Sequence, residues 1–192
     1  MDVVSELKAR IQAEGQNLGN GILKIDSLIN HQIDPVLIMR CGVELAERFR
    51  EQRVTRILTA EVSGIAPALA TAVALGVPLV YARKTKPITM YGPVFLETAP
   101  SHTKGYETQL LVAAEFMPPG ERVLIIDDFL ASGRTLKSLI RIVQSARSEV
   151  VGVGAVVEKI FEGGRDALQK YNVPIEAVVT ITDMENGAIS FD

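Results

Sequence analysis

Two adjacent aspartates, Asp127 and Asp128, end an aliphatic run in the stretch V-L-I-I-D-D-F-L-A-S-G-R-T, residues 123–135. The aliphatic run predicts a buried strand over residues 123–127, and the amphipathic pattern after Gly133 predicts a helix. On one side of the turn between them, carboxylates suit hydroxyl groups or a metal ion. On the other side, unpaired backbone N–H groups at the helix N-terminus suit a phosphate. The stretch therefore predicts a site for a phosphorylated ligand.

The aspartate pair has other interpretations, because carboxylates that follow a strand also cap turns. A phospho-accepting receiver domain also has aspartates at a strand end, but it does not explain the phosphate-cradle composition after them. Small residues in 131–135 allow close backbone approach, and the hydroxyls of Ser132 and Thr135 can donate. The chain has no G-x-x-x-x-G-K-[ST] motif and no complete G-x-G-x-x-G, so neither common nucleotide-binding loop is supported.

The elements that position these residues alternate between strand and helix patterns, which predicts an α/β fold with a mostly parallel sheet. In the helix expected over residues 34–50, Val36, Met39, Val43 and Ala46 mark one face. Residues 87–107 are expected to form a long loop or hairpin. The predicted strands cover residues 22–25, 54–60, 77–82, 109–114, 123–127, 150–157 and 175–181. The remaining predicted helices cover residues 3–13, 66–75 and 166–171 and the segment after residue 135.

Four predicted strands end in polar clusters, which lie at residues 61–64, 83–86, 127–128 and 158–159. In open sheets of this class, ligands bind beyond the carboxyl ends of the strands, so the clusters are expected to converge on one site. Each cluster also has a structural interpretation. The basic run 83–86 can be a solvated loop, and Lys159 can form a salt bridge with Glu158 or another acid.

Composition limits the class of protein. Of 192 residues, 47% are hydrophobic and 22% are charged, as in one ordinary globular domain. The formal net charge of −3 gives no support for general nucleic-acid binding, which needs a basic surface. The single cysteine, Cys41, excludes an intramolecular disulfide, and the absence of Cys/His clusters argues against structural zinc. No apolar run approaches the roughly 18 residues of a membrane span, so we expect a soluble cytoplasmic protein.

The stretch 123–135 resembles the phosphoribosyl pyrophosphate (PRPP) motif of the type I phosphoribosyltransferases, in which two acidic residues, two apolar residues and a small-hydroxyl-Gly-x-Thr loop follow a strand. E-V-S-G-I-A-P-A, A-R-K-T-K-P and V-V-E-K-I-F also occur in the order expected for this family. The segment L-K-I-D-S-L-I-N-H-Q-I-D-P is similar to the bacterial xanthine phosphoribosyltransferases. The resemblance covers nearly the whole chain. Phe129 is bulkier than the residue common in the family, and Ser132 replaces a frequent threonine but keeps the hydroxyl.

This resemblance implies one phosphoribosyltransferase domain over residues 1–192, with a core at about 35–160 and a small hood from about 1–34 and 161–192. It implies purine salvage, in which xanthine and PRPP give xanthosine 5′-monophosphate (XMP) and pyrophosphate, with Mg²⁺ on the pyrophosphate and no dedicated protein metal site. Asp127 and Asp128 are the implied catalytic residues, which stabilise positive charge on the ribose. The implied PRPP-binding residues are Ala131, Ser132, Gly133, Arg134 and Thr135.

Further implied contacts surround the pyrophosphate. Residues 61–64 together with Arg83 and Lys84 are expected to face it. The segment 87–107, with Ser101 and Lys104, is expected to close over it and exclude water.

The implied xanthine-binding residues are Leu23, Asn30 and Lys159. A lysine ammonium only donates hydrogen bonds, so Lys159 near the purine 6-position favours a 6-oxo base over adenine. Asn30 can meet the 2-oxo group of xanthine, and Leu23 can cover the ring. Guanine and hypoxanthine remain alternative substrates, and adenine is a weaker one.

A different class of function also fits the PRPP motif, because some transcription regulators carry the same PRPP-binding domain without catalysis. This chain has little room for an added DNA-binding domain. The resemblance otherwise implies a homodimeric enzyme that binds two small molecules and neither nucleic acid nor a membrane.

Overall fold

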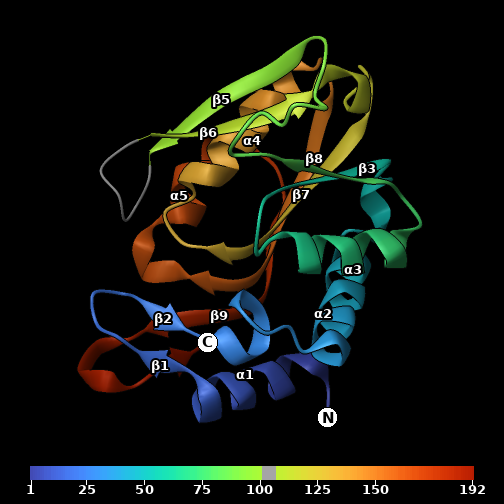
Figure 1. The fold of residues 1–192 in the computed structure, drawn as a ribbon. Helices are drawn as coiled ribbons and strands as arrows, with labels where there is room; N and C mark the ends of the chain where they lie inside the picture. The colour runs from blue at the N-terminus through green and yellow to red at the C-terminus, as the bar shows by residue number, and fades with distance from the viewer. Residues whose placement is uncertain (101–106) are drawn as a thin grey trace.

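The computed structural model describes residues 1–100 and 107–192, and alternating helices and strands build it (Figure 1). The helices are α1 (Val3–Glu14), α2 (Pro35–Arg48), α3 (Ile65–Leu75), α4 (Arg134–Ser145) and α5 (Gly164–Leu168). The long strands are β3 (Arg56–Ala60), β4 (Leu79–Ala82), β5 (Val94–Pro100), β6 (Glu107–Ala113), β7 (Arg122–Leu130), β8 (Glu149–Lys159) and β9 (Ile175–Asp183). Short strands are β1 (Gln16–Asn17), β2 (Leu23–Lys24) and β10 (Ser190–Phe191).

The central sheet has the strand order β10-β9-β8-β7-β3-β4. Its strands pair in parallel except for β10, which pairs antiparallel with β9. This arrangement confirms the predicted α/β fold with a mostly parallel sheet. The carboxyl ends of β8, β7, β3 and β4 are neighbours, and these are the four strands whose ends carry the predicted polar clusters.

Strand β7 lies in the interior of the sheet and is buried on both faces. Val123 and Ile125 belong to one hydrophobic cluster, whereas Leu124 and Ile126 belong to the other. Successive side chains of a strand point to opposite faces, so a continuous aliphatic run is what a doubly covered strand requires. Helices α1, α2 and α3 contribute to the cluster of Leu124, and α4 and α5 contribute to that of Val123.

The N-terminal hairpin, formed by β1 and β2, lies beside the C-terminal segment of the chain at the bottom of Figure 1. Asn17 Nδ2 donates a hydrogen bond to the carbonyl oxygen of Met184 at 2.6 Å, and Lys8 binds the backbone carbonyl of Asp192 at 2.7 Å. Buried Leu23 and Ile25 share a hydrophobic cluster with α2 and β9. The Asn17 contact holds the N-terminal hairpin beside Met184, just after the carboxyl end of β9.

Strands β5 and β6 form an antiparallel hairpin, so the expected loop or hairpin at 87–107 is a hairpin whose second strand is β6. Backbone hydrogen bonds of 2.9 and 2.8 Å join Arg83 to Leu111 and attach this hairpin to the segment after β4. Ser101 and Lys104, which we expected over the pyrophosphate, lie outside the described residues.

The predicted face of α2 differs from the buried one. Ala46 is buried, but Val36, Met39 and Val43 are exposed, and Val36 has an exposed fraction of 67%. The buried face carries other residues, namely Leu37, Ile38, Cys41, Gly42 and Leu45. Apolar residues lie on both sides of α2, so spacing alone does not select its buried face. Packing against α3 selects it, because a side chain on Gly42 would collide with Ala70.

Candidate active site

Strand β7 continues through both aspartates to Leu130, so the predicted end at residue 127 was three residues too early. Pairing with β8 extends the strand, because Asp127 is opposite Ala155 and Leu130 is opposite Glu158. Neighbouring strand residues face opposite sides of the sheet, so the two carboxylates enter different environments.

Asp127 is buried and close to the N-terminus of α3. Its Oδ1 accepts a hydrogen bond from the backbone N–H of Asp128 at 3.0 Å. Burial, followed by the neighbouring charge of Asp128, raises the pKa of the Asp127 carboxyl well above its usual range, and Lys84 only partly offsets this. A side-chain carbon on Gly64 would lie 2.7 Å from Asp127 Oδ1, so glycine is required for this approach.

Asp128 is half-buried, and its partner comes from the N-terminal part of the chain. Its Oδ2 accepts a hydrogen bond of 2.6 Å from Nδ2 of Asn30. Asn30 ends the π-helical turn Asp26–Asn30, and its side chain is exposed. A predicted ribose-binding residue and a predicted base-binding residue are therefore in direct contact, although 98 positions separate them.

The loop between β7 and α4 forms a small cavity of about 70 Å³. Gly133 precedes α4 with φ of +72°, which turns the chain into the helix N-terminus. The loop packs backbone to backbone on α5, since a side-chain carbon on Gly164 would lie 2.1 Å from the carbonyl oxygen of Ala131. All five predicted PRPP-binding residues line the cavity. The complete lining is Asp127, Phe129, Ala131, Ser132, Gly133, Arg134, Thr135 and Leu136.

The clusters that end β3 and β4 meet through Glu61. Its Oε1 accepts a 2.6 Å hydrogen bond from the backbone N–H of Lys84, and its Oε2 lies 3.8 Å from Arg83 Nε. The Glu61–Val62 peptide bond is cis. This contact brings two more of the four predicted clusters together at the same edge of the sheet as Asp127.

At the end of β8, the side chains of Glu158 and Lys159 lie in different environments. Glu158 is buried, and its Oε1 accepts a 2.8 Å hydrogen bond from Nε of Arg165 in α5. Lys159 Nζ donates to the carbonyl oxygen of Gly21 at 2.8 Å and forms an ion pair with Glu162. The salt bridge considered for Lys159 thus exists, with Glu162 as its partner.

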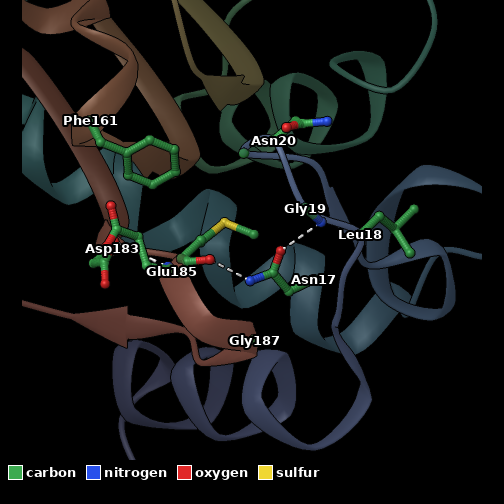
Figure 2. Close-up of a pocket in the computed structure, with 10 residues that line it drawn as sticks. Asn17, Leu18, Gly19, Asn20, Phe161, Asp183, Glu185 and Gly187 are labelled. Carbon is green, nitrogen blue, oxygen red and sulfur yellow. Dashed lines mark hydrogen bonds between the residues drawn. The ribbon is translucent and has the colours of Figure 1, made fainter.

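A second, wider cavity of about 750 Å³ opens between the N-terminal hairpin and the C-terminal segment (Figure 2). Phe161, Asp183 and Glu185 line it, and the Asn17 amide spans it, held by hydrogen bonds to Met184 and Gly19. None of the predicted site residues in the described part of the chain lines this cavity. We place the candidate site at the smaller cavity, because a phosphate needs the backbone donors of the loop after β7 more than it needs volume.

Sequence reasoning missed Gly21, Glu162 and Gly164. Glu162 stands three positions after Lys159, and that spacing becomes informative only when the chain makes a 3₁₀ turn over Ile160–Glu162. Gly21 and Gly164 act through close backbone contacts, which leave no sign in the sequence.

Two negative findings apply to the described part of the chain. It contains no cluster of three or more His, Cys, Asp or Glu side chains arranged to hold a metal ion. None of its helices combines the length and apolar character needed to cross a membrane.

Comparisons with known proteins identify a family and several relatives that this chain resembles. Residues 34–191 match the family model described as "Phosphoribosyl transferase domain". The chain is similar to a xanthine phosphoribosyltransferase from Moorella thermoacetica, with 44% identity over 100% of this chain and 97% of the relative. A xanthine phosphoribosyltransferase from Deinococcus deserti is 47% identical over 92% of each chain. Among solved structures, an adenine phosphoribosyltransferase from Rhodothermus marinus superposes with a TM-score of 0.75 and 25% identity, covering 93% of this chain and 98% of that one.

Proposed function

The chain belongs to the phosphoribosyl transferase domain family, and on this premise we propose that it is a xanthine phosphoribosyltransferase of purine salvage. It transfers the phosphoribosyl group of PRPP to xanthine and releases XMP and pyrophosphate. The observation that carries this proposal is the similarity to named xanthine phosphoribosyltransferases over essentially the full chain.

In this proposal the loop 131–135 binds the 5′-phosphate through its backbone N–H groups and the N-terminus of α4. The bond from ribose C1 to pyrophosphate breaks as the bond from C1 to the base nitrogen forms, and the proton of that nitrogen leaves to solvent or to the departing pyrophosphate. Positive charge grows on the ribose during this exchange, and Asp128 is well placed to stabilise it. Burial raises the pKa of Asp127, so its charge is disfavoured until Mg²⁺ or the positive charge on the ribose is close to it. We therefore assign the larger electrostatic contribution to Asp128.

The two carboxylates at this site suit a Mg²⁺ ion that enters bound to the pyrophosphate group of PRPP. Mg²⁺ commonly binds one or two carboxylates together with phosphate oxygens and waters, and Asp127 and Asp128 are the carboxylates beside the predicted PRPP site. When bound, the ion would neutralise pyrophosphate and make it a better leaving group. Glu61, Arg83 and Lys84 lie at the neighbouring strand ends and complete the proposed pyrophosphate side.

Base selection is proposed to depend on Lys159. Its ammonium donates to the 6-oxo group of a purine and has no acceptor for the amino group of adenine. Leu23 covers the ring. Asn30 Nδ2 donates one hydrogen bond to Asp128 in the structure, and the second N–H of its amide is the donor we assign to the 2-oxo group.

The proposal is tested by incubating purified protein with PRPP, with and without Mg²⁺, and separately with xanthine, guanine, hypoxanthine or adenine. We expect Mg²⁺-dependent formation of XMP and pyrophosphate, with kcat/KM highest for xanthine and lowest for adenine. No nucleotide with any base would contradict the enzyme proposal, and preferred turnover of adenine would contradict the role of Lys159.

The homodimer that the resemblance implies is also part of this proposal. Val36, Met39 and Val43 on α2 and Leu69 and Val73 on α3 are exposed apolar side chains, as expected where a second copy packs. The mass of the protein in solution tests it.

A further inference from the structure

Three groups from different parts of the fold contact the ammonium of Lys159. The side chain is 12% exposed, and Nζ lies 5.6 Å from the centroid of the Phe129 ring. Nζ also donates to the carbonyl oxygen of Gly21 at 2.8 Å and pairs with Oε1 of Glu162. Contacts from β7, from the N-terminal hairpin turn and from the 3₁₀ turn after β8 therefore converge on one cation.

A lysine ammonium has three N–H donors, and these partners determine how many of them a base can use. The Gly21 carbonyl takes one donor and the Glu162 carboxylate takes another. One donor remains for an oxygen of the base. Lysine otherwise carries its charge on a flexible four-carbon stem, so two fixed acceptors determine where the last N–H points.

Glu162 can act in this way because local backbone geometry holds it in place. The 3₁₀ turn Ile160–Glu162 brings its carboxylate back toward Lys159, and Gly163 ends that turn with φ of +72°. On the opposite side, a side-chain carbon on Gly21 would lie 3.2 Å from the Phe161 ring and 3.6 Å from Glu162 Oε1. Figure 2 shows Phe161 and the turn at Gly19 and Asn20 around the cavity between the N-terminal hairpin and the C-terminal segment.

An ion pair between residues three positions apart is often a surface contact worth only about 0–1 kcal/mol. This pair differs in two respects. Both side chains are mostly buried, with Glu162 21% exposed, and the same ammonium binds a carbonyl 138 positions away in sequence. The ammonium therefore joins the turn after β8 to the N-terminal hairpin, whereas a purely local ion pair would stay within the turn.

We propose that Glu162 is a specificity-determining positioning residue, which holds the Lys159 ammonium so that its remaining N–H donates to the 6-oxo group of the base. This inference rests on the proposed function. Glu162 itself does not contact the reacting atoms. It acts through Lys159, and the consequence is discrimination between 6-oxo purines and adenine.

The test is a double-mutant cycle with Glu162→Gln, Lys159→Met and the combined variant. For Glu162→Gln we expect the KM for xanthine and the Kd for XMP to rise about tenfold, because a charged hydrogen-bond acceptor is lost. The KM for PRPP and the value of kcat should change less than twofold, and the preference for xanthine over adenine should fall. In the Lys159→Met background, Glu162→Gln should have no further effect on the Kd for XMP.

Glu185→Gln is the matched control, since this carboxylate lines the neighbouring cavity without contacting Lys159. The Tm of each variant reports folding, and titration calorimetry with XMP gives a binding value where turnover is slow. Equal xanthine KM and XMP Kd in wild type and Glu162→Gln would overturn the inference, as would an undiminished effect of Glu162→Gln in the Lys159→Met background. Wild-type protein that makes no XMP would instead overturn the proposed function, and this inference with it.

Discussion

The two halves of the candidate site are assembled differently. The proposed ribose-phosphate half consists of Asp127, Asp128 and residues 131–135, which one continuous stretch from β7 to α4 supplies. The base half consists of Leu23, Asn30 and Lys159, which come from the N-terminal hairpin, a π-helical turn and the end of β8. A strand and a helix hold the first half rigidly. The second half depends on contacts between distant segments, so small changes there should alter the choice of base without abolishing transfer.

The halves meet at the 2.6 Å hydrogen bond from Asn30 to Asp128. Asp128 is therefore shared between the two proposed halves, because its carboxylate has acceptor sites for a ribose hydroxyl as well as for the Asn30 amide. Variants can test whether the two proposed halves otherwise act independently.

The largest effect is expected for Asp128→Asn. Loss of a charge that stabilises the transition state should lower kcat by about 100-fold, with a smaller rise in the KM for PRPP. The loss should be the same for xanthine and guanine, because this residue belongs to the ribose-phosphate half. Steady-state kinetics with both bases measures it.

Asp166→Asn, a change at an exposed carboxylate on α5, is the control for that experiment. An unchanged kcat in Asp128→Asn would show that this carboxylate only stabilises the turn. A loss that differs strongly between bases would break the division into two halves.

A smaller effect is expected for Gly133→Ala. The left-handed backbone costs an alanine about 1–2 kcal/mol, and the new carbon would meet the Gly164 carbonyl oxygen at 3.2 Å. We expect the KM for PRPP to rise about tenfold while the KM for xanthine is unchanged. Initial rates with each substrate varied in turn separate the two constants.

Gly120→Ala is a matched control, because Gly120 has φ of +85° but no neighbouring atom within 4 Å of the added carbon. It should lose stability to a similar extent and keep the KM for PRPP. If both variants raised that KM equally, general destabilisation would explain the result, and the backbone packing of the phosphate loop would not.

The smallest expected effect is on thermal stability, and it concerns Asp127 rather than Asp128. The folded state raises the pKa of Asp127, so the stability linked to its protonated form is present below the ordinary pKa and is lost as pH rises through the folded value. Asp127→Asn should therefore have a higher Tm than wild type at pH 8, and the difference should shrink toward pH 4. A gain on the order of 1 kcal/mol would raise the Tm by about 2–4 °C in a chain of this size.

Scanning calorimetry across this pH range measures the difference. Asp127→Asn should also lose activity, as expected when a site residue is buried at a cost to stability. A Tm difference that is constant with pH would show that ionisation of Asp127 is not the cause.

Much of the fold could be predicted because local patterns and tertiary packing agree. The aliphatic runs of β7 and β8 require cover on both faces, and alternating helices provide it. The loop between β7 and α4 was also predictable as a turn into a helix, since glycine, hydroxyl residues and a helix start are close together in sequence. Prediction was less accurate where a local pattern permits two outcomes, as at α2, whose exposed residues Val36 and Met39 are as apolar as its buried ones.

By itself, the sequence determined the α/β class and the order of the strands along the chain, and it predicted the residues that we assign to the ribose-phosphate half. These depend on hydrophobic periodicity and on the chemistry of adjacent residues. Only the tertiary structure decided that Asn30 meets Asp128, that Glu158 pairs with Arg165 and that Glu162 shares the ammonium of Lys159 with Gly21. The physical reason is that hydrogen bonds and ion pairs act over a few ångströms, and chain folding alone brings these distant partners within that range.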